Sequence, residues 1–296
     1  MSKYIILGHE KPDVDSIVSG YIYQNYLRRR NIDAEFIIPD KNIDEDTLEI
    51  CRRFHLEPTN FQKELVIDNQ TKFILVDHHN RKELKNVELI IDHHLDEHEP
   101  DTENCINEPA SSTSCLIVQG NEPFYSIHEI ELACMAAMVD TASFHSTKAK
   151  DWDLAWIEKM VEEKNLDYNK LYEAGLIIND ISNKEEAMFH GLKKHNIHGH
   201  NVESSTIQVN GMHNNWKNIN KIIKHIQEYI TNKEDLDYFL YIIHDMDNYE
   251  TWLYTFNKDG YTRKKYNEYT SRGSTIIPEF ENDLKYTPKQ KVKTDN

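Results

Sequence analysis

The chain has 296 residues, of which 39% are hydrophobic and 29% charged, so it is long enough for two globular domains of ordinary size. Its formal net charge of −17 disfavours long nucleic acid as a partner, but it allows phosphate chemistry wherever bound divalent cations reverse the local field. Short apolar runs, the lack of a signal-peptide pattern and four scattered cysteines predict a cytoplasmic protein without a membrane partner.

Strand and helix patterns alternate over residues 1–182, which predicts an α/β domain with a largely parallel sheet. Short apolar runs favour strands, and apolar residues at helical spacing favour amphipathic helices. We expect strands at 4–7, 34–38, 72–76 and 87–91, and helices at 16–30, 45–54, 112–119, 127–139 and 152–164.

The apolar signal falls away around residues 183–187, which we interpret as a linker. Residues 188–285 then predict a second, smaller α/β domain, and residues 286–296 a frayed tail. In the second domain we expect strands at 205–209, 238–243 and 251–256, and a helix at 216–230.

Polar residues with metal-binding chemistry follow the first predicted strand. His9, Asp13 and Asp15 lie between that strand and the next helix. In an open parallel sheet, ligands bind at the carboxyl ends of the strands. Asp13 or Asp15 could instead cap the following helix, and this segment alone does not decide between the two interpretations.

Two Asp-His-His triplets close two further apolar strands. The first is Asp77-His78-His79 and the second is Asp92-His93-His94. One such triplet could arise by chance in a chain with 16 histidines, whereas two at equivalent positions are harder to dismiss. Asp140 also ends an apolar segment, although alone it would indicate a capping residue.

Together these segments predict a two-metal site. Four carboxylates and two imidazoles suit divalent ions of the Mn or Mg type better than structural zinc, which favours thiolates. Two such ions can share a bridging carboxylate and catalyse the hydrolysis of a phosphoanhydride or phosphoester. The six candidate ligands are His9, Asp13, Asp15, Asp77, His93 and Asp140.

The same four segments, in this order, resemble the DHH phosphoesterase superfamily, and the resemblance covers most of the first 150 residues. Within it the chain is most similar to the family II, manganese-dependent inorganic pyrophosphatases, which Glu108–Ser114 and Ser271–Pro278 also resemble. The resemblance implies a DHH metal-binding catalytic domain followed by a DHHA2-like substrate-binding domain. It also implies hydrolysis of pyrophosphate to two phosphates, and an association into a homodimer would fit this family.

Roles for individual residues follow from the resemblance. It implies one Mn²⁺ on His9, Asp13 and Asp77, and a second on Asp15, Asp77, His93 and Asp140, with Asp77 as the catalytic bridge and Mg²⁺ as an alternative ion. His94 would contact the substrate or its transition state, or else orient a ligand. Arg272 and Lys194 would bind phosphate, although Lys194 lies in a Lys-Lys-His stretch that would be solvated in any case.

Three alternatives remain beside pyrophosphate hydrolysis. Gly273 stands where the family has a lysine after the signature arginine, so one phosphate-binding charge is missing. Residues 91–97 also resemble exopolyphosphatases, and a short polyphosphate is therefore a competing substrate. A nucleotide phosphodiesterase is less favoured because the chain has no Gly-Gly pair, which such relatives carry in a nucleic-acid-binding segment. A non-catalytic binding relative is the third alternative.

Overall fold

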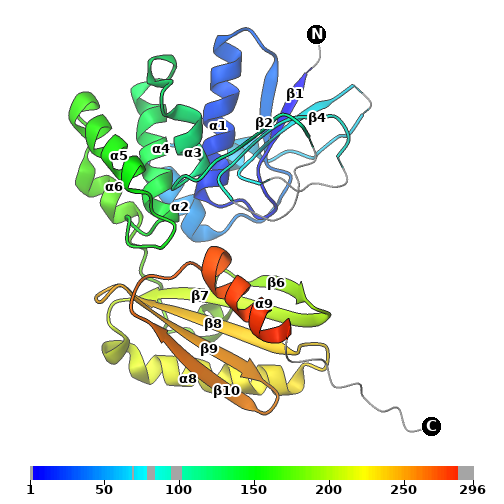
Figure 1. Ribbon diagram of the computed structural model, residues 1–296, viewed down its shortest axis with the longest axis vertical. Helices are drawn as coiled ribbons and strands as arrows, with labels where there is room; N and C mark the ends of the chain where they lie inside the picture. Colours follow the sequence, from blue (N-terminus) through cyan, green and yellow to red (C-terminus); the bar gives the residue numbers. More distant parts are fainter. Residues whose placement is uncertain (1–2, 69, 79–83, 95–101, 286–296) are drawn as a thin grey trace. The chain divides into compact units, whose positions relative to one another are not determined.

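The computed structural model describes residues 3–68, 70–78, 84–94 and 102–285, and the predicted tail at 286–296 lies outside them. The chain forms two compact units, each shown in Figure 1. The first comprises Met1–Phe144 and Lys148–Leu176, and the second comprises His145–Thr147 and Ile177–Asn296. The residues expected to form a linker, 183–187, therefore belong to the second unit.

The first unit is built on a five-stranded sheet of order β2-β1-β3-β4-β5, in which every neighbouring pair is parallel. The predicted parallel α/β domain is confirmed. The three-residue strand β5 was not predicted, because it is too short to carry an alternating pattern. The strands are β1 (Tyr4–Leu7), β2 (Ala34–Ile37), β3 (Lys72–Val76), β4 (Val87–Asp92) and β5 (Cys105–Asn107).

Helices of the first unit pack beside this sheet, with α1 in contact with α3, α4 and β2 (Figure 1). Ser126 and Glu129 form a reciprocal capping box at the start of α4, which fixes where this helix begins. The sheet's inner strands are apolar and buried, as expected for strands covered on both faces. The helices are α1 (Val14–Arg29), α2 (Glu45–Arg53), α3 (Thr113–Val118), α4 (Ile127–Asp140), α5 (Asp151–Lys164) and α6 (Tyr168–Ala174), with short 3₁₀ turns η1 (Pro58–Phe61) and η2 (Glu122–Phe124).

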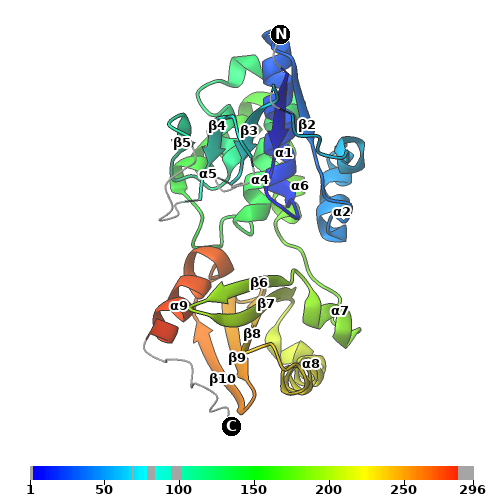
Figure 2. The ribbon, with the colours of Figure 1, turned by 90° about the vertical axis from the view of Figure 1, so that its right-hand side faces the viewer.

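The second unit is a mixed five-stranded sheet of order β10-β9-β8-β7-β6, in which β7 and β8 are parallel and the other pairs antiparallel. Helix α8 lies on one face of this sheet and α9 on the other (Figure 2), and apolar residues of each helix pack against the sheet. The elements are α7 (Lys184–Phe189), β6 (Lys193–Ile197), β7 (His200–Val209), α8 (Met212–Asn232), β8 (Tyr238–Asp245), β9 (Glu250–Asn257), β10 (Gly260–Tyr266), the π-helical turn η3 (Arg272–Ile276) and α9 (Ile277–Lys285).

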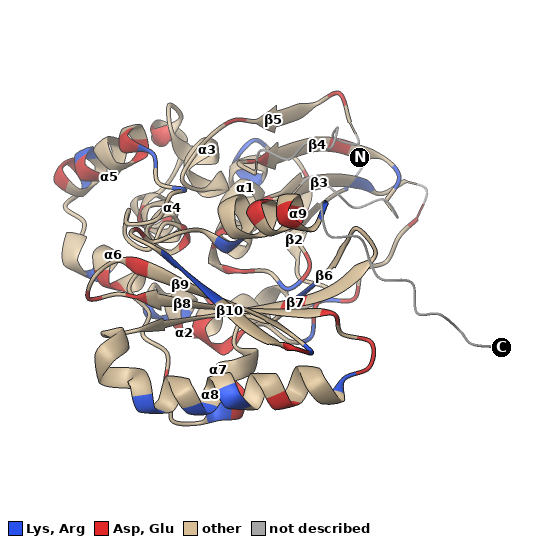
Figure 3. Ribbon diagram, turned by 60° about the horizontal axis from the view of Figure 1, so that its bottom comes forward, with Lys and Arg blue, Asp and Glu red and all other residues tan. Residues whose placement is uncertain are grey.

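Two strands of this sheet, β6 and β10, were not predicted, because both are charged edge strands. The sequence of β10 carries Arg263, Lys264 and Lys265, which Figure 3 colours blue together with the other Lys and Arg residues. Charged side chains are common on edge strands, where they hinder pairing with other chains. No helix within the described ranges is long and apolar enough to cross a membrane.

A glycine allows the close contact between α1 and β2. A Cβ atom at Gly20 would lie 2.2 Å from Cε2 of Phe36, a ring that is only 1% exposed.

We therefore expect Gly20→Ala to lower the free energy of unfolding by about 1–3 kcal/mol, although alanine favours helices in general. Urea denaturation measures this. Gly273→Ala, which places a Cβ where no atom lies within 4 Å, is the control, and a Gly20→Ala protein as stable as wild type would contradict the packing.

Candidate metal centre

The loop after β1 brings His9 and Asp13 together. A Cβ at Gly8 would lie 2.1 Å from Oγ of Ser16, and this hydroxyl accepts a hydrogen bond from the His9 amide at 3.1 Å, so glycine permits the close approach that fixes His9. Asp13 caps α1 through Oδ1, which accepts from the Ser16 amide at 3.1 Å. Its Oδ2 lies 3.3 Å from Nε2 of His9. The capping role and the predicted ligand position thus coincide in one carboxylate.

Asp77 lies at the centre of the site, directly after β3. It adopts a left-handed conformation with φ of 64°, which aspartate tolerates better than most residues, and it is 2% exposed. Its Oδ2 is 3.5 Å from Nε2 of His9, and its Oδ1 is 3.6 Å from Nε2 of His93. The two oxygens of Asp77 therefore face two different histidines, an arrangement that would allow this carboxylate to bridge two cations.

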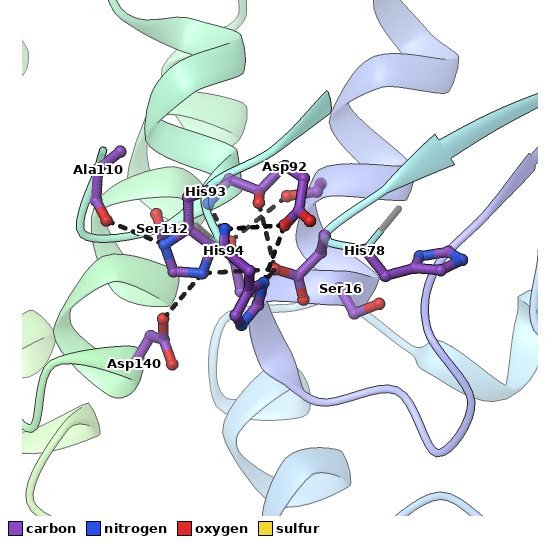
Figure 4. A network of polar contacts seen from close by, with 12 residues as sticks. Ser16, His78, Asp92, His93, His94, Ala110, Ser112 and Asp140 are labelled. Atoms are coloured by element: carbon purple, nitrogen blue, oxygen red, sulfur yellow. Dashed lines mark hydrogen bonds and ion pairs between the residues drawn. The ribbon is translucent and has the colours of Figure 1, made fainter. Parts of the chain in front are cut away.

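His93 is oriented by a backbone contact (Figure 4). Its Nδ1 lies 2.9 Å from the carbonyl oxygen of Ala110, which can only accept, so Nδ1 carries a proton and Nε2 is the ring nitrogen that faces the site. That Nε2 is 3.3 Å from Oδ2 of Asp140, at the end of α4. Such a contact from the opposite ring nitrogen is what commonly holds a metal-ligating histidine in place.

Asp15 is the sixth predicted ligand, and the start of α3 holds it. Its oxygens accept hydrogen bonds from the amides of Thr113 at 2.7 Å and Ser114 at 3.1 Å. Donor atoms of the predicted ligands and His94 form three groups, and within each group they all lie within 4.8 Å of one another. They are His9, Asp13 and Asp77; Asp77, His93 and His94; and Asp15, His93 and Asp140.

The donor atoms fit divalent cations. Oδ2 of Asp77, Nε2 of His93 and Oδ2 of Asp140 are buried and have no hydrogen-bond partner among the described residues, a state that costs free energy unless a cation fills it. Burial and the neighbouring charges of Asp15 and Asp13 raise the pKa of Asp77 well above its ordinary value. Carboxylate oxygens and imidazole nitrogens are both common ligands of divalent metal ions in proteins.

His94 is placed differently from the metal-facing histidine before it. Its backbone amide and its Nδ1 both contact Oδ1 of Asp92, at 3.0 and 2.8 Å, and its side chain is 43% exposed. The aspartate of the second triplet thus orients His94 instead of joining the donor clusters. His78, from the first triplet, points away from the cluster in Figure 4 and contacts the Val76 carbonyl. His79 lies outside the described residues.

A lysine that sequence reasoning did not single out lies beside Asp140. Nζ of Lys148 is 2.7 Å from Oδ1 of Asp140. Burial alone would raise the pKa of Asp140, but the charges of Lys148 and His93 outweigh it, and the pKa lies below its ordinary value. Lys148, Asp92 and Thr113 were missed as contributors to the site. Thr113 belongs to the hydroxyl-rich segment quoted above, whereas no sequence pattern marks Lys148.

The second unit holds the two predicted phosphate-binding residues in unlike surroundings. Arg272 is half-buried, and its Nη1 donates to the Gly191 carbonyl at 2.6 Å. Burial lowers its pKa to about 10, which leaves it charged at neutral pH. Lys194 is 73% exposed and lies 3.8 Å from Glu203 on the neighbouring strand β7. The structure thus gives Arg272 a fixed position and leaves Lys194 a solvated surface lysine.

The comparisons with known proteins agree with this arrangement. Residues 3–141 match the family described as "DHH family, N-terminal domain". That segment makes up most of the first unit, so the likeness to this family rests on the first unit. The probable manganese-dependent inorganic pyrophosphatase of a Bacillus cereus strain is 25% identical over 268 residues, 83% of each chain. That of Lactobacillus acidophilus is 24% identical over 258 residues, 82% of each chain.

A solved structure extends the fold likeness to both units. The crystal structure of a proposed family II inorganic pyrophosphatase from Methanococcus jannaschii superposes with a TM-score of 0.68 at 18% identity, and covers 94% of this chain and 98% of that one. At this identity the likeness establishes the fold only. It bears out the expected α/β fold, with a parallel first sheet and a second, mixed-sheet domain.

Near Arg272, the buried His244 makes the free energy of unfolding depend on pH. Nδ1 of His244 contacts Oγ1 of Thr251 at 3.0 Å, and burial, aided by the charge of Arg272, lowers the pKa of His244 to about 3 from its ordinary 6.5. The folded chain thus disfavours the protonated ring. The contribution of the neutral His244 to the free energy of unfolding is complete above about pH 6.5. It is lost as the pH falls toward 3, because His244 takes up a proton at a higher pH in the unfolded chain than in the folded one.

We predict that His244→Gln flattens this acid-side loss. The wild-type free energy of unfolding should fall by up to about 1.4 kcal/mol per pH unit more than that of the variant between pH 6 and 4. Urea titrations at several pH values measure it. His213→Gln, which changes an exposed imidazole of the same unit, is the control and should keep the wild-type slope. An equal slope for His244→Gln would refute the assignment.

Proposed function

We propose that the chain hydrolyses inorganic pyrophosphate to two phosphates with two divalent cations, Mn²⁺ or Mg²⁺. The observation that carries this proposal is the placement of Asp77, whose two oxygens face His9 and His93 from one buried carboxylate. The names of the relatives, which describe manganese-dependent inorganic pyrophosphatases, support the same conclusion. Two cations held there would stabilise negative charge on phosphoryl oxygens and make a water molecule more acidic.

The residues of the chain would hold and orient the reacting groups. Asp92 fixes the ring of His94 through Nδ1, so Nε2 of His94 is the atom left to contact a phosphoryl oxygen. The Ala110 carbonyl fixes His93, and the amides of Thr113 and Ser114 fix Asp15. These contacts keep the ligands in place before a cation binds, which reduces the reorganisation that binding and catalysis require.

A compact substrate suits the charge distribution better than a long anion. Of the basic run on β10, Lys264 is 2.6 Å from Glu279 and Lys265 is 2.6 Å from Glu250, so these two charges are already neutralised. A long polyphosphate or a nucleic acid would require a continuous basic track. We therefore propose a small phosphate compound as the substrate and keep Arg272 as a proposed phosphate-binding residue.

A phosphate-release assay tests this function. With Mn²⁺ or Mg²⁺ supplied, we expect turnover of pyrophosphate to exceed that of tripolyphosphate, tetrapolyphosphate and the nucleotide pAp. Preference for the longer chains would instead indicate an exopolyphosphatase, and preference for pAp a phosphodiesterase. Tight Mn²⁺ binding with no phosphate released from any compound would indicate a non-catalytic relative.

The bridging position is tested by Asp77→Asn, which keeps the side-chain volume and removes the charge. We expect pyrophosphatase activity to fall by about 100-fold or more, because the bridge would be lost. The metal-free variant should melt no lower than metal-free wild type, because the substitution also removes a repelled carboxylate. Added Mn²⁺ should raise the melting temperature less than in wild type.

Asp167→Asn is the matched control for this substitution. Asp167 caps α6 far along the chain from the candidate ligands, and asparagine caps helices as well as aspartate does. Its activity and its response to Mn²⁺ should equal those of wild type. Unchanged turnover in Asp77→Asn would rule out the bridging role.

A further inference from the structure

The two oxygens of Asp140 have different surroundings. Oδ1 contacts Nζ of Lys148 at 2.7 Å, and the lysine side chain is only 20% exposed. Oδ2 is buried, has no hydrogen-bond partner among the described residues, and lies 3.3 Å from Nε2 of His93. One oxygen is thus taken by an ammonium group of the chain, and only the other remains for a cation shared with His93.

Two contacts within the first unit hold the chain before and after Lys148, although His145–Thr147, directly before it, belong to the second unit. Thr141 closes α4, since its hydroxyl donates to the Ala137 carbonyl at 2.6 Å and accepts from the Phe144 amide at 3.0 Å. Two residues beyond the lysine, the amide of Lys150 donates to Oγ of Ser111 at 3.0 Å. These anchors limit how far the ammonium group can move away from Asp140.

This position makes Lys148 a competitor of a divalent cation. A cation on Oδ2 of Asp140 would share one carboxylate with the ammonium group and would be repelled by it over a short, poorly hydrated distance. Contact with the lysine also withdraws negative charge from the carboxylate, which makes it a poorer ligand. On the other side of the site, His9 faces two carboxylates, at 3.3 Å from Asp13 and 3.5 Å from Asp77, so the penalty falls mainly beside Asp140.

We propose that Lys148 is a positioning residue that weakens cation binding at Asp15, His93 and Asp140 relative to His9, Asp13 and Asp77. This inference rests on the proposed two-cation function. It implies that the weaker position fills efficiently only together with the anionic substrate, whose negative charge offsets the lysine. Lys148 would thereby couple loading of the second cation to the arrival of pyrophosphate.

Mn²⁺ titration of the full-length, metal-free chain tests the proposal without an activity measurement. Calorimetry on wild type should give one tight and one weak site. In Lys148→Met, which removes the charge and keeps the length, the weak site should tighten by about tenfold or more while the tight site changes by less than about threefold. Electron paramagnetic resonance of free Mn²⁺ provides an independent count of bound ions.

The non-hydrolysable analogue imidodiphosphate tests the coupling. It should tighten the weak Mn²⁺ site of wild type strongly, and that of Lys148→Met by a smaller factor, because the charge it offsets is gone. Lys148→Arg should retain the wild-type isotherm. Lys170→Gln breaks another lysine–carboxylate contact of the first unit, 3.2 Å to Glu131, and is the control that should match wild type.

The outcomes separate this proposal from the proposed function. Failure of wild type to bind any Mn²⁺ would overturn both. Two bound Mn²⁺ with an isotherm that Lys148→Met leaves unchanged, or with a weak site that this variant weakens further, would overturn the role of Lys148 alone. Circular dichroism verifies that each variant is folded, and Lys148→Gln replaces the methionine variant if that one does not fold.

Discussion

The site depends on one electrostatic constraint, which is that several carboxylates are crowded around the buried Asp77. Burial and the charges of Asp15, Asp13 and Asp140 all act against its ionised form. A fold that served stability alone would not gather these groups at one edge of a sheet. Parallel strands bring the ends of β1, β3 and β4 to the same edge, so the residues that follow them meet without any long connection. The arrangement becomes favourable once cations supply the missing positive charge.

The surrounding protein forms hydrogen bonds with some polar atoms of the candidate ligands and leaves other atoms of the same side chains facing the cluster. Two backbone amides bind Asp15, a carbonyl binds the far nitrogen of His93, and the α1 cap uses one oxygen of Asp13. Each contact fixes the orientation of a ligand that also faces the cluster. Oδ2 of Asp77 and Nε2 of His93, which do face it, are left without a hydrogen bond from the described residues. The candidate ligands are thus held in position while some of their donor atoms remain available to bind a cation.

Sequence patterns predicted the parts of the molecule that depend on local chemistry. Apolar runs located β1, β3 and β4, and the polar residues directly after them located the candidate ligands. The charged edge strands β6 and β10 escaped because half-solvated strands lack an apolar run. Residues 183–187 resemble a linker because they are polar, yet Asn183 caps α7, whose Ala187 and Met188 are buried in the second core. Lys148 was missed because its contact with Asp140 depends on the turn after α4, which no spacing rule encodes.

The negative net charge of the whole chain is compatible with a cation-dependent site. A net charge of −17 would repel a phosphate anion at a distance, and two of the basic residues of β10 are paired with glutamates. If the chain binds a phosphate compound as proposed, most of the positive charge at the candidate metal centre would come from bound cations, with Lys148 as a fixed positive charge beside Asp140. Because Lys148 opposes the cation next to it, the total positive charge of the site is limited until an anion arrives. An acidic surface and a cation-dependent site are therefore compatible: the net charge disfavours long polyanions, whereas the proposed cations would supply the positive charge that a small anion requires.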